Sequence, residues 1–122
     1  MKIQQSAEDY LETMLMLRER NGYIRSVDVA THLGVTKPSV SYATKRLRES
    51  GYIINDENGL IVLLPAGEAI AQEMYARHKL LSECLIALGV PEEIALRDAC
   101  RIEHDISPET FNAISHHVQS MK

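Results

Sequence analysis

The sequence has no tryptophan and a single phenylalanine, Phe111, among its 122 residues. Its core must therefore be built from Leu, Ile, Val, Ala and Met rather than from large aromatic side chains. Cysteine is also scarce, since only Cys84 and Cys100 occur. No secretory leader and no apolar run of membrane-spanning length is visible, so we expect a cytoplasmic protein whose cysteines are free thiols. The length allows one compact domain, or a small unit with a helical extension.

Charge is distributed unevenly along the chain. The net charge of −4 argues against a nonspecific nucleic-acid binder. Between residues 36 and 48, however, every charged residue is basic, whereas between residues 92 and 109 six acids accompany only two arginines. The first segment suits an anionic partner and the second suits a cation.

Capping residues and apolar spacing predict a mainly helical protein. Ser6, Ser26 and Thr36 are expected to cap the first three helices, and Asn58-Gly59 between two short apolar runs favours a hairpin. The predicted helices are 6–20, 27–33, 36–49, 66–88, 91–104 and a last one that begins at Ser107, and the predicted strands are 52–54 and 60–64.

Three helices followed by a hairpin form a winged helix-turn-helix. We therefore expect residues 1–65 to form a winged helix-turn-helix DNA-binding domain. Residues 66–122 are expected to form a helical dimerisation and metal-binding domain.

The segment from Ser26 to Ser41 has the pattern of a helix-turn-helix, with Gly34 permitting the turn. Val40, Ala43 and Leu47 are expected to face the core, which leaves hydroxyl and basic side chains for base edges and phosphates. A basic helix face by itself is as often a solvated surface, but the helix-turn-helix context favours DNA. The candidate DNA-binding residues are Thr36, Lys37, Pro38, Ser39, Ser41, Tyr42, Lys45 and Arg46. Whether the acidic wing tip contacts DNA is left open.

A second candidate site lies near the acidic segment. Cys100, Glu103 and His104 stand at i, i+3 and i+4, so they share one face of a helix. Thiolate, carboxylate and imidazole suit a borderline divalent transition metal better than calcium or magnesium. A small buried cysteine beside a chance Glu–His pair is the competing interpretation.

Two other groups strengthen the metal interpretation. His78 lies on the apolar stripe of the long helix and could supply a further imidazole ligand. A lone histidine at such a position is, however, more often a core residue. Asp9 and Glu12 form an i, i+3 pair in the first helix beside Leu11, Met14 and Leu15, which are expected to be buried. Carboxylates at the edge of an apolar face need a partner, and a metal would supply one.

Three separated segments, Ser6–Glu12, Tyr75–Leu81 and Asp98–His104, resemble the diphtheria toxin repressor and manganese transport regulator family over nearly the whole chain. The resemblance implies a homodimeric repressor of metal-homeostasis genes that binds double-stranded operator DNA with Fe(II) or Mn(II) as co-repressor. It implies no enzymatic activity, no small-molecule substrate and no membrane partner. Carried over residue by residue, the implied metal ligands are Asp9, Glu12, His78, Cys100, Glu103 and His104.

The implied ligand set mixes two branches of that family. Cys100 matches the iron-responsive branch, whereas Asp9 matches the manganese-responsive one. A thiolate favours Fe(II) over Mn(II), and Zn(II), Co(II) or Ni(II) would also bind in vitro, so the physiological metal stays open. Two other classes also stay open: a winged-helix regulator that responds to a non-metal ligand, and a metalloenzyme or metal-storage protein. No nucleophile–base pair supports an enzyme.

Overall fold

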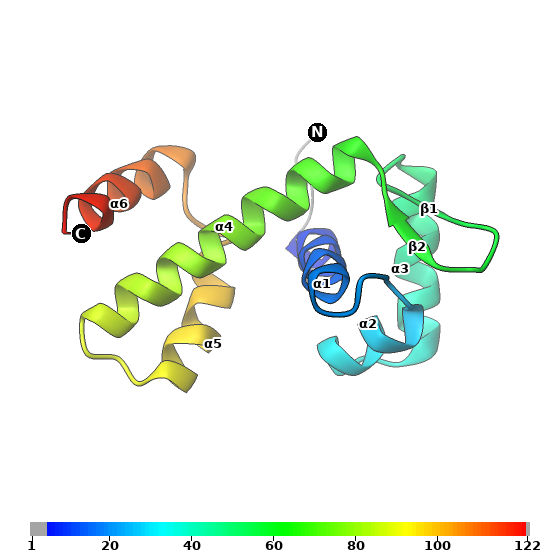
Figure 1. The fold of residues 1–122 in the computed structure, drawn as a ribbon, viewed down its shortest axis with the longest axis horizontal. Coiled ribbons are helices and arrows are strands. Elements are labelled where there is room, and N and C mark those ends of the chain that lie inside the picture. Colours follow the sequence, from blue (N-terminus) through cyan, green and yellow to red (C-terminus); the bar gives the residue numbers. More distant parts are fainter. Residues whose placement is uncertain (1–4, 122) are drawn as a thin grey trace. The chain divides into compact units, whose positions relative to one another are not determined.

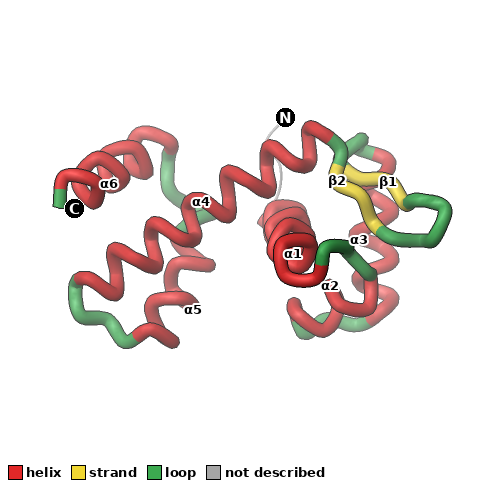
Figure 2. The backbone as a smooth tube through the Cα atoms, in the orientation of Figure 1, coloured by secondary structure: helices red, strands yellow, loops and turns green. Residues whose placement is uncertain are grey.

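The computed structural model describes residues 5–121, which form helices and a short antiparallel hairpin (Figures 1 and 2). The predicted mainly helical class is confirmed. The elements are α1 (Gln5–Asn21), α2 (Ser26–Leu33), α3 (Lys37–Glu49), β1 (Ile53–Asn55), β2 (Ile61–Leu63), α4 (Pro65–Ala87), α5 (Glu92–Ile102) and α6 (Pro108–Ser120). None of the helices within residues 5–121 is both long and apolar enough to cross a membrane.

The chain divides into two compact units, Met1–Glu73 and Met74–Lys122. The division lies inside α4, whereas the predicted domain boundary lies at residue 65. In the N-terminal unit, Leu11, Met14 and Leu15 of α1 are completely buried, as predicted. Removing such aliphatic side chains from water is the main stabilising contribution to a small core that has no tryptophan.

The predicted caps of the first two helices are wrong, because both serines lie inside their helices. Helix α1 already includes Gln5, so Ser6 lies within it, because glutamine is itself a good helix former. Helix α2 is preceded by Arg25, whose backbone is extended and whose carbonyl accepts a bond from the N–H of Val29 at 3.2 Å. Ser26 is therefore the first helical residue rather than the cap.

The turn between α2 and α3 follows its prediction. Gly34 adopts the left-handed conformation with φ of 68° and donates its N–H to the carbonyl of Ala30. The side chain of Thr36 then caps α3 by accepting a hydrogen bond from the N–H of Ser39 at 3.2 Å. Both residues thus do what the sequence pattern predicted.

The hairpin pairs β1 with β2 in antiparallel register, with Ile53 opposite Leu63. It is joined to the segment between α1 and α2 by a bond from the N–H of Ile61 to the carbonyl of Ile24 at 2.9 Å. After β2 the chain passes so close to Tyr52 that a Cβ on Gly67 would lie 2.2 Å from the Tyr52 carbonyl oxygen. Only glycine fits there without a shift of the backbone.

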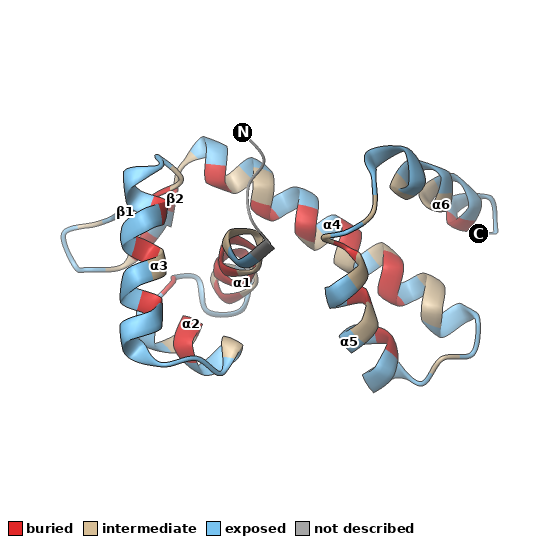
Figure 3. Ribbon diagram, turned by 180° about the vertical axis from the view of Figure 1, so that it is seen from behind, coloured by how far each residue is buried: buried red, intermediate tan, exposed pale blue. Residues whose placement is uncertain are grey.

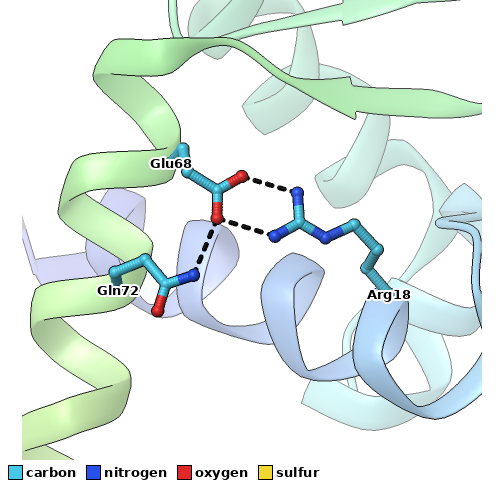
Figure 4. Close-up of polar contacts among 3 residues, drawn as sticks. All are labelled: Arg18, Glu68 and Gln72. Carbon is cyan, nitrogen blue, oxygen red and sulfur yellow. Dashed lines mark hydrogen bonds and ion pairs between the residues drawn. The ribbon is translucent and has the colours of Figure 1, made fainter.

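The first turns of α4 are tied to α1 by an ion pair (Figure 4). The guanidinium of Arg18 donates to both carboxylate oxygens of Glu68, at 2.5 and 2.6 Å, and Gln72 donates to the second oxygen at 2.8 Å. These bonds lower the pKa of Glu68 to about 2. A guanidinium that donates two parallel hydrogen bonds to a carboxylate fixes the relative orientation of the two groups and also stabilises their opposite charges.

The C-terminal unit contains the rest of α4 with α5 and α6. Its buried residues include Met74 and Leu81 of α4 and the small residues Ala95 and Ala99 of α5 (Figure 3). Helix α6 begins where Ser107 accepts a hydrogen bond from the N–H of Thr110 at 3.1 Å. The predicted start of that helix is confirmed.

Helix α5 ends two residues earlier than predicted, at Ile102. The N–H of Glu103 still bonds to Ala99, but the N–H of Asp105 bonds to Ile102, three residues back, so the chain tightens into a turn. Glu103 and His104 consequently lie in the turn that follows α5.

Candidate functional site

The exposed side of α3 carries the candidate DNA-binding residues. Every one of them, from Thr36 to Arg46, is exposed, as the sequence pattern predicted, and the buried positions form a narrow stripe (Figure 3). Tyr42 and Arg46 lie one turn apart, with the guanidinium donating to the tyrosine hydroxyl at 3.1 Å and lying over its ring. An aromatic ring, hydroxyls and cations on one exposed helix face can contact both base edges and phosphates.

The buried side of α3 differs from its prediction at one position. Val40 and Leu47 are buried as expected, but the third buried residue is Thr44, while Ala43 is only half-buried. The Thr44 hydroxyl donates to the carbonyl of Val40 at 2.8 Å, which satisfies it inside the core. A threonine can therefore replace an apolar residue there because its polar atom bonds back to its own helix.

The wing is held by hydrogen bonds among its own residues. A carboxylate oxygen of Asp56 accepts the N–H groups of Asn58 and Leu60, at 2.8 and 2.9 Å. Asn55 accepts a bond from Arg48 of α3 at 2.9 Å and donates to the carbonyl of Gly59. Asp56, the first acid of the wing tip, is thus used to shape the turn.

Helix α1 brings two carboxylates together in the N-terminal unit. A side-chain oxygen of Asp9 and one of Glu12 lie within 4.8 Å of each other. Glu12 is 5% exposed and Asp9 is half-buried. Their i, i+3 spacing places both on one face of the helix, as predicted.

The C-terminal unit contains a cluster of one carboxylate and two imidazoles. Glu103 is completely buried, and one of its oxygens lies 3.3 Å from Nδ1 of His78 on α4. The other oxygen lies 3.4 Å from Nε2 of His104, whose side chain is 1% exposed. Burying a carboxylate this deeply is costly unless polar or charged partners compensate it, and a metal ion is one partner that could do so.

The donor atoms of this cluster fit a divalent transition metal. Nitrogen and carboxylate ligands lie about 2.0–2.2 Å from such a metal, so neighbouring ligand atoms are roughly 3.0–3.5 Å apart. The two nitrogen–oxygen distances, 3.3 and 3.4 Å, fall in that range. Imidazole with carboxylate also suits Mn(II), Fe(II) and Zn(II).

Cys100 differs from the other predicted ligands. Both cysteines are free thiols, as expected, and Cys100 is exposed, whereas Glu103 and the side chain of His104 are buried. It takes no part in the two contacts of Glu103, so the structure brings together His78, Glu103 and His104 and leaves Cys100 outside them.

The sequence reading missed Arg77, which lies next to His78. Arg77 is 6% exposed, and its guanidinium donates to the carbonyls of Glu103 at 3.0 Å and Ile106 at 2.9 Å. The signal was present, because Arg77 stands at helical spacing between the buried residues Met74 and Leu81. A charged residue on an apolar stripe requires partners, and these carbonyls are partners of the right kind.

Two family models together match almost the whole chain. The model described as the iron dependent repressor, N-terminal DNA binding domain, matches residues 2–59. The model described as the iron dependent repressor, metal binding and dimerisation domain, matches residues 64–122.

Individual relatives agree with these matches. The transcriptional regulator MntR of Salmonella typhimurium is 42% identical over 106 residues, which are 87% of this chain and 68% of the relative. The HTH-type transcriptional regulator MntR of Geobacillus kaustophilus is 37% identical over 114 residues, which are 93% of this chain and 81% of the relative.

Solved structures show the same fold. The metal-dependent transcriptional regulator MtsR is 26% identical with a TM-score of 0.84, and the match covers 93% of this chain and 53% of that one. A manganese-dependent transcriptional repressor in complex with manganese is 25% identical, also with a TM-score of 0.84, over 93% of this chain and 52% of that one. The chain therefore spans about half the length of these solved structures.

Proposed function

This chain belongs to the iron-dependent repressor family of metal-dependent transcriptional regulators, and we propose that it binds operator DNA as a homodimer when Fe(II) or Mn(II) is bound. Families of this kind regulate transcription and are not enzymes, so no catalytic residue is assigned. We place its action in the cytoplasm, on genes of metal homeostasis.

The buried Glu103 between two imidazoles is the observation that carries the metal dependence. Its oxygens lie 3.3 and 3.4 Å from ring nitrogens of His78 and His104. When bound, a divalent metal supplies positive charge that neutralises such a carboxylate. The same three side chains then hold the turn after α5 close to α4.

The proposed ligand set extends beyond this cluster. Mn(II) prefers octahedral coordination by hard ligands, which requires more donors than His78, Glu103 and His104 provide. We assign Asp9 and Glu12 as further ligands because they are a close carboxylate pair with little exposure. Cys100, a free and exposed cysteine, remains in the proposed set because the family resemblance implies it as a ligand.

The face of α3 from Thr36 to Arg46 is the proposed DNA-reading surface. Lys37 and Lys45 are suited to phosphates, and Tyr42 with Arg46 to base edges. Homodimer formation is proposed for the C-terminal unit, where Leu88, Ile94 and Leu96 are between 41% and 75% exposed. In a helix-turn-helix dimer, two such α3 helices read successive major-groove half-sites.

The test is fluorescence anisotropy with a labelled DNA fragment from upstream of the protein's own gene. Protein is titrated in chelator, then anaerobically with Fe(II) and separately with Mn(II). We expect metal to raise the DNA affinity by at least about fivefold, the lower end of typical allosteric coupling. Equal affinity with chelator and with both metals would refute metal dependence and favour a regulator that responds to a non-metal ligand.

Ligand substitutions test the two carboxylate sets separately. Glu12→Gln and Glu103→Gln are each expected to abolish the metal-dependent gain in DNA affinity. Glu93→Gln, at an exposed position of α5, is the matched control and should retain the gain. If Glu12→Gln also retains it, the α1 carboxylates are not ligands.

A further inference from the structure

Arg77 is a buried cation that donates two hydrogen bonds to the short segment after α5. Its terminal nitrogen Nη1 donates to the carbonyl of Glu103 at 3.0 Å and to that of Ile106 at 2.9 Å. The guanidinium carbon lies 5.4 Å from the ring centroid of Phe111, at the start of α6. Burial of an arginine is unfavourable unless its donors are used, so these contacts fix the guanidinium in place.

The segment that Arg77 holds is the turn that carries two proposed metal ligands. Helix α5 ends at Ile102, and after the bond from Glu103 to Ala99 the N–H of Asp105 bonds to Ile102, three residues back. The bonds from Arg77 lie at the two ends of the turn, 103 and 106, and His104 lies between them. They therefore restrict the backbone from which both ligand side chains project.

Arg77 also connects this turn to the third ligand. His78 is its neighbour on α4, so one turn of that helix supplies both the guanidinium that holds the Glu103 backbone and the imidazole that contacts the Glu103 carboxylate. If the turn moved away from α4, the backbone bonds from Arg77 would break, and the His78 imidazole would separate from the Glu103 carboxylate at the same time.

We propose that Arg77 is a positioning residue that keeps His78, Glu103 and His104 arranged for a divalent metal before the metal binds. This inference rests on the proposed metal dependence. A preformed cluster loses less conformational freedom on binding, which raises affinity without adding a ligand. Mutation of a residue that orients metal ligands without binding the metal itself typically lowers metal affinity by about 10–100-fold.

The test compares metal binding by the full chain and by Arg77→Lys, which keeps the positive charge but has no planar fork. Mn(II) affinity is measured by electron paramagnetic resonance, and the Co(II)-loaded protein is examined by visible absorption for its coordination geometry. We expect Arg77→Lys to lose about 10–100-fold in Mn(II) affinity and to shift the Co(II) absorption bands. Arg97→Lys, an exposed arginine of α5, should match the unsubstituted protein.

A structural role would give a different pattern. Far-UV circular dichroism and the urea midpoint are measured in chelator for each variant. Unchanged Mn(II) affinity and Co(II) spectrum in Arg77→Lys would overturn the inference, even if the urea midpoint falls. If Arg77→Lys fails to fold, Phe111→Leu decides, because it removes only the ring beside the guanidinium: a weaker metal affinity with a shifted spectrum supports the inference, and unchanged values overturn it. Absence of metal binding by the unsubstituted protein would refute the proposed function itself.

Discussion

The ion pair between Arg18 and Glu68 gives a stability prediction that depends on pH. The pKa of Glu68 is about 2 in the folded protein, below its ordinary value of 4.5, chiefly because Arg18 and then Gln72 donate to its carboxylate. A carboxyl with a lowered pKa stabilises the fold at any pH above its unfolded pKa. That contribution is lost as the pH falls from about 4.5 towards 2.

The size of the effect follows from the pKa change and the exposure. A depression of about 2.5 pKa units corresponds to roughly 3 kcal/mol. However, the side chains of Arg18 and Glu68 are 37% and 31% exposed, and solvent screening reduces the contribution of such pairs. For Glu68→Gln we therefore expect a loss of about 1–1.5 kcal/mol in the free energy of unfolding at pH 7.

The assay is urea denaturation followed by circular dichroism between pH 7 and pH 3. The difference between the unsubstituted protein and Glu68→Gln should be constant above about pH 5.5 and should shrink towards pH 3. Glu57→Gln, at an exposed position of the wing, should change stability by less than about 0.5 kcal/mol. A Glu68→Gln difference that stays the same from pH 7 to pH 3 would show that the pair does not stabilise the protein through charge.

Three further predictions concern the N-terminal unit. Thr36→Ala removes the hydroxyl that caps α3 at Ser39 and should lower the free energy of unfolding by about 1 kcal/mol, whereas Thr36→Ser should preserve it; equal losses in urea titrations would refute the capping role. Gly67→Ala places a Cβ against the carbonyl of Tyr52 and should cost about 1–3 kcal/mol; an unchanged melting temperature would mean that α4 shifts freely there. Lys45→Ala removes an exposed cation of α3 and should reduce the slope of log affinity for DNA against log salt by about one; an unchanged slope would place Lys45 away from phosphate.

The order of the helices was predictable because their ends are determined by local chemistry. Gly34 ends α2 and Thr36 begins α3 through bonds that span three or four residues. The predictions at Ser6 and Ser26 were wrong because both residues lie inside their helices, and α2 begins after Arg25 without a side-chain cap. Thr44 was missed because a polar side chain is normally expected on the exposed face of a helix, whereas Thr44 is buried.

The candidate site was predictable only in part. The spacing of Glu103 and His104 pointed to a shared helix face, yet α5 ends at Ile102, so that Glu103 caps the helix and His104 lies in the turn that follows. The contact of Glu103 with His78 joins residues far apart in the chain, and no local pattern encodes such a distance. Arg77 was overlooked for the same reason, since its partners are backbone carbonyls, which every residue possesses.

The hydrogen bonds of the wing have a consequence for the order of folding. Asp56 bonds to Asn58 and Leu60 at separations of two and four residues, so closing the turn requires little loss of chain entropy. The bond from Ile61 to Ile24, by contrast, must wait until the whole helix-turn-helix has been brought together. During refolding we expect pulsed hydrogen exchange to show the Leu60 amide protected before that of Ile61, and the reverse order would refute it. The wing would then form as an independent local turn and dock onto the domain afterwards.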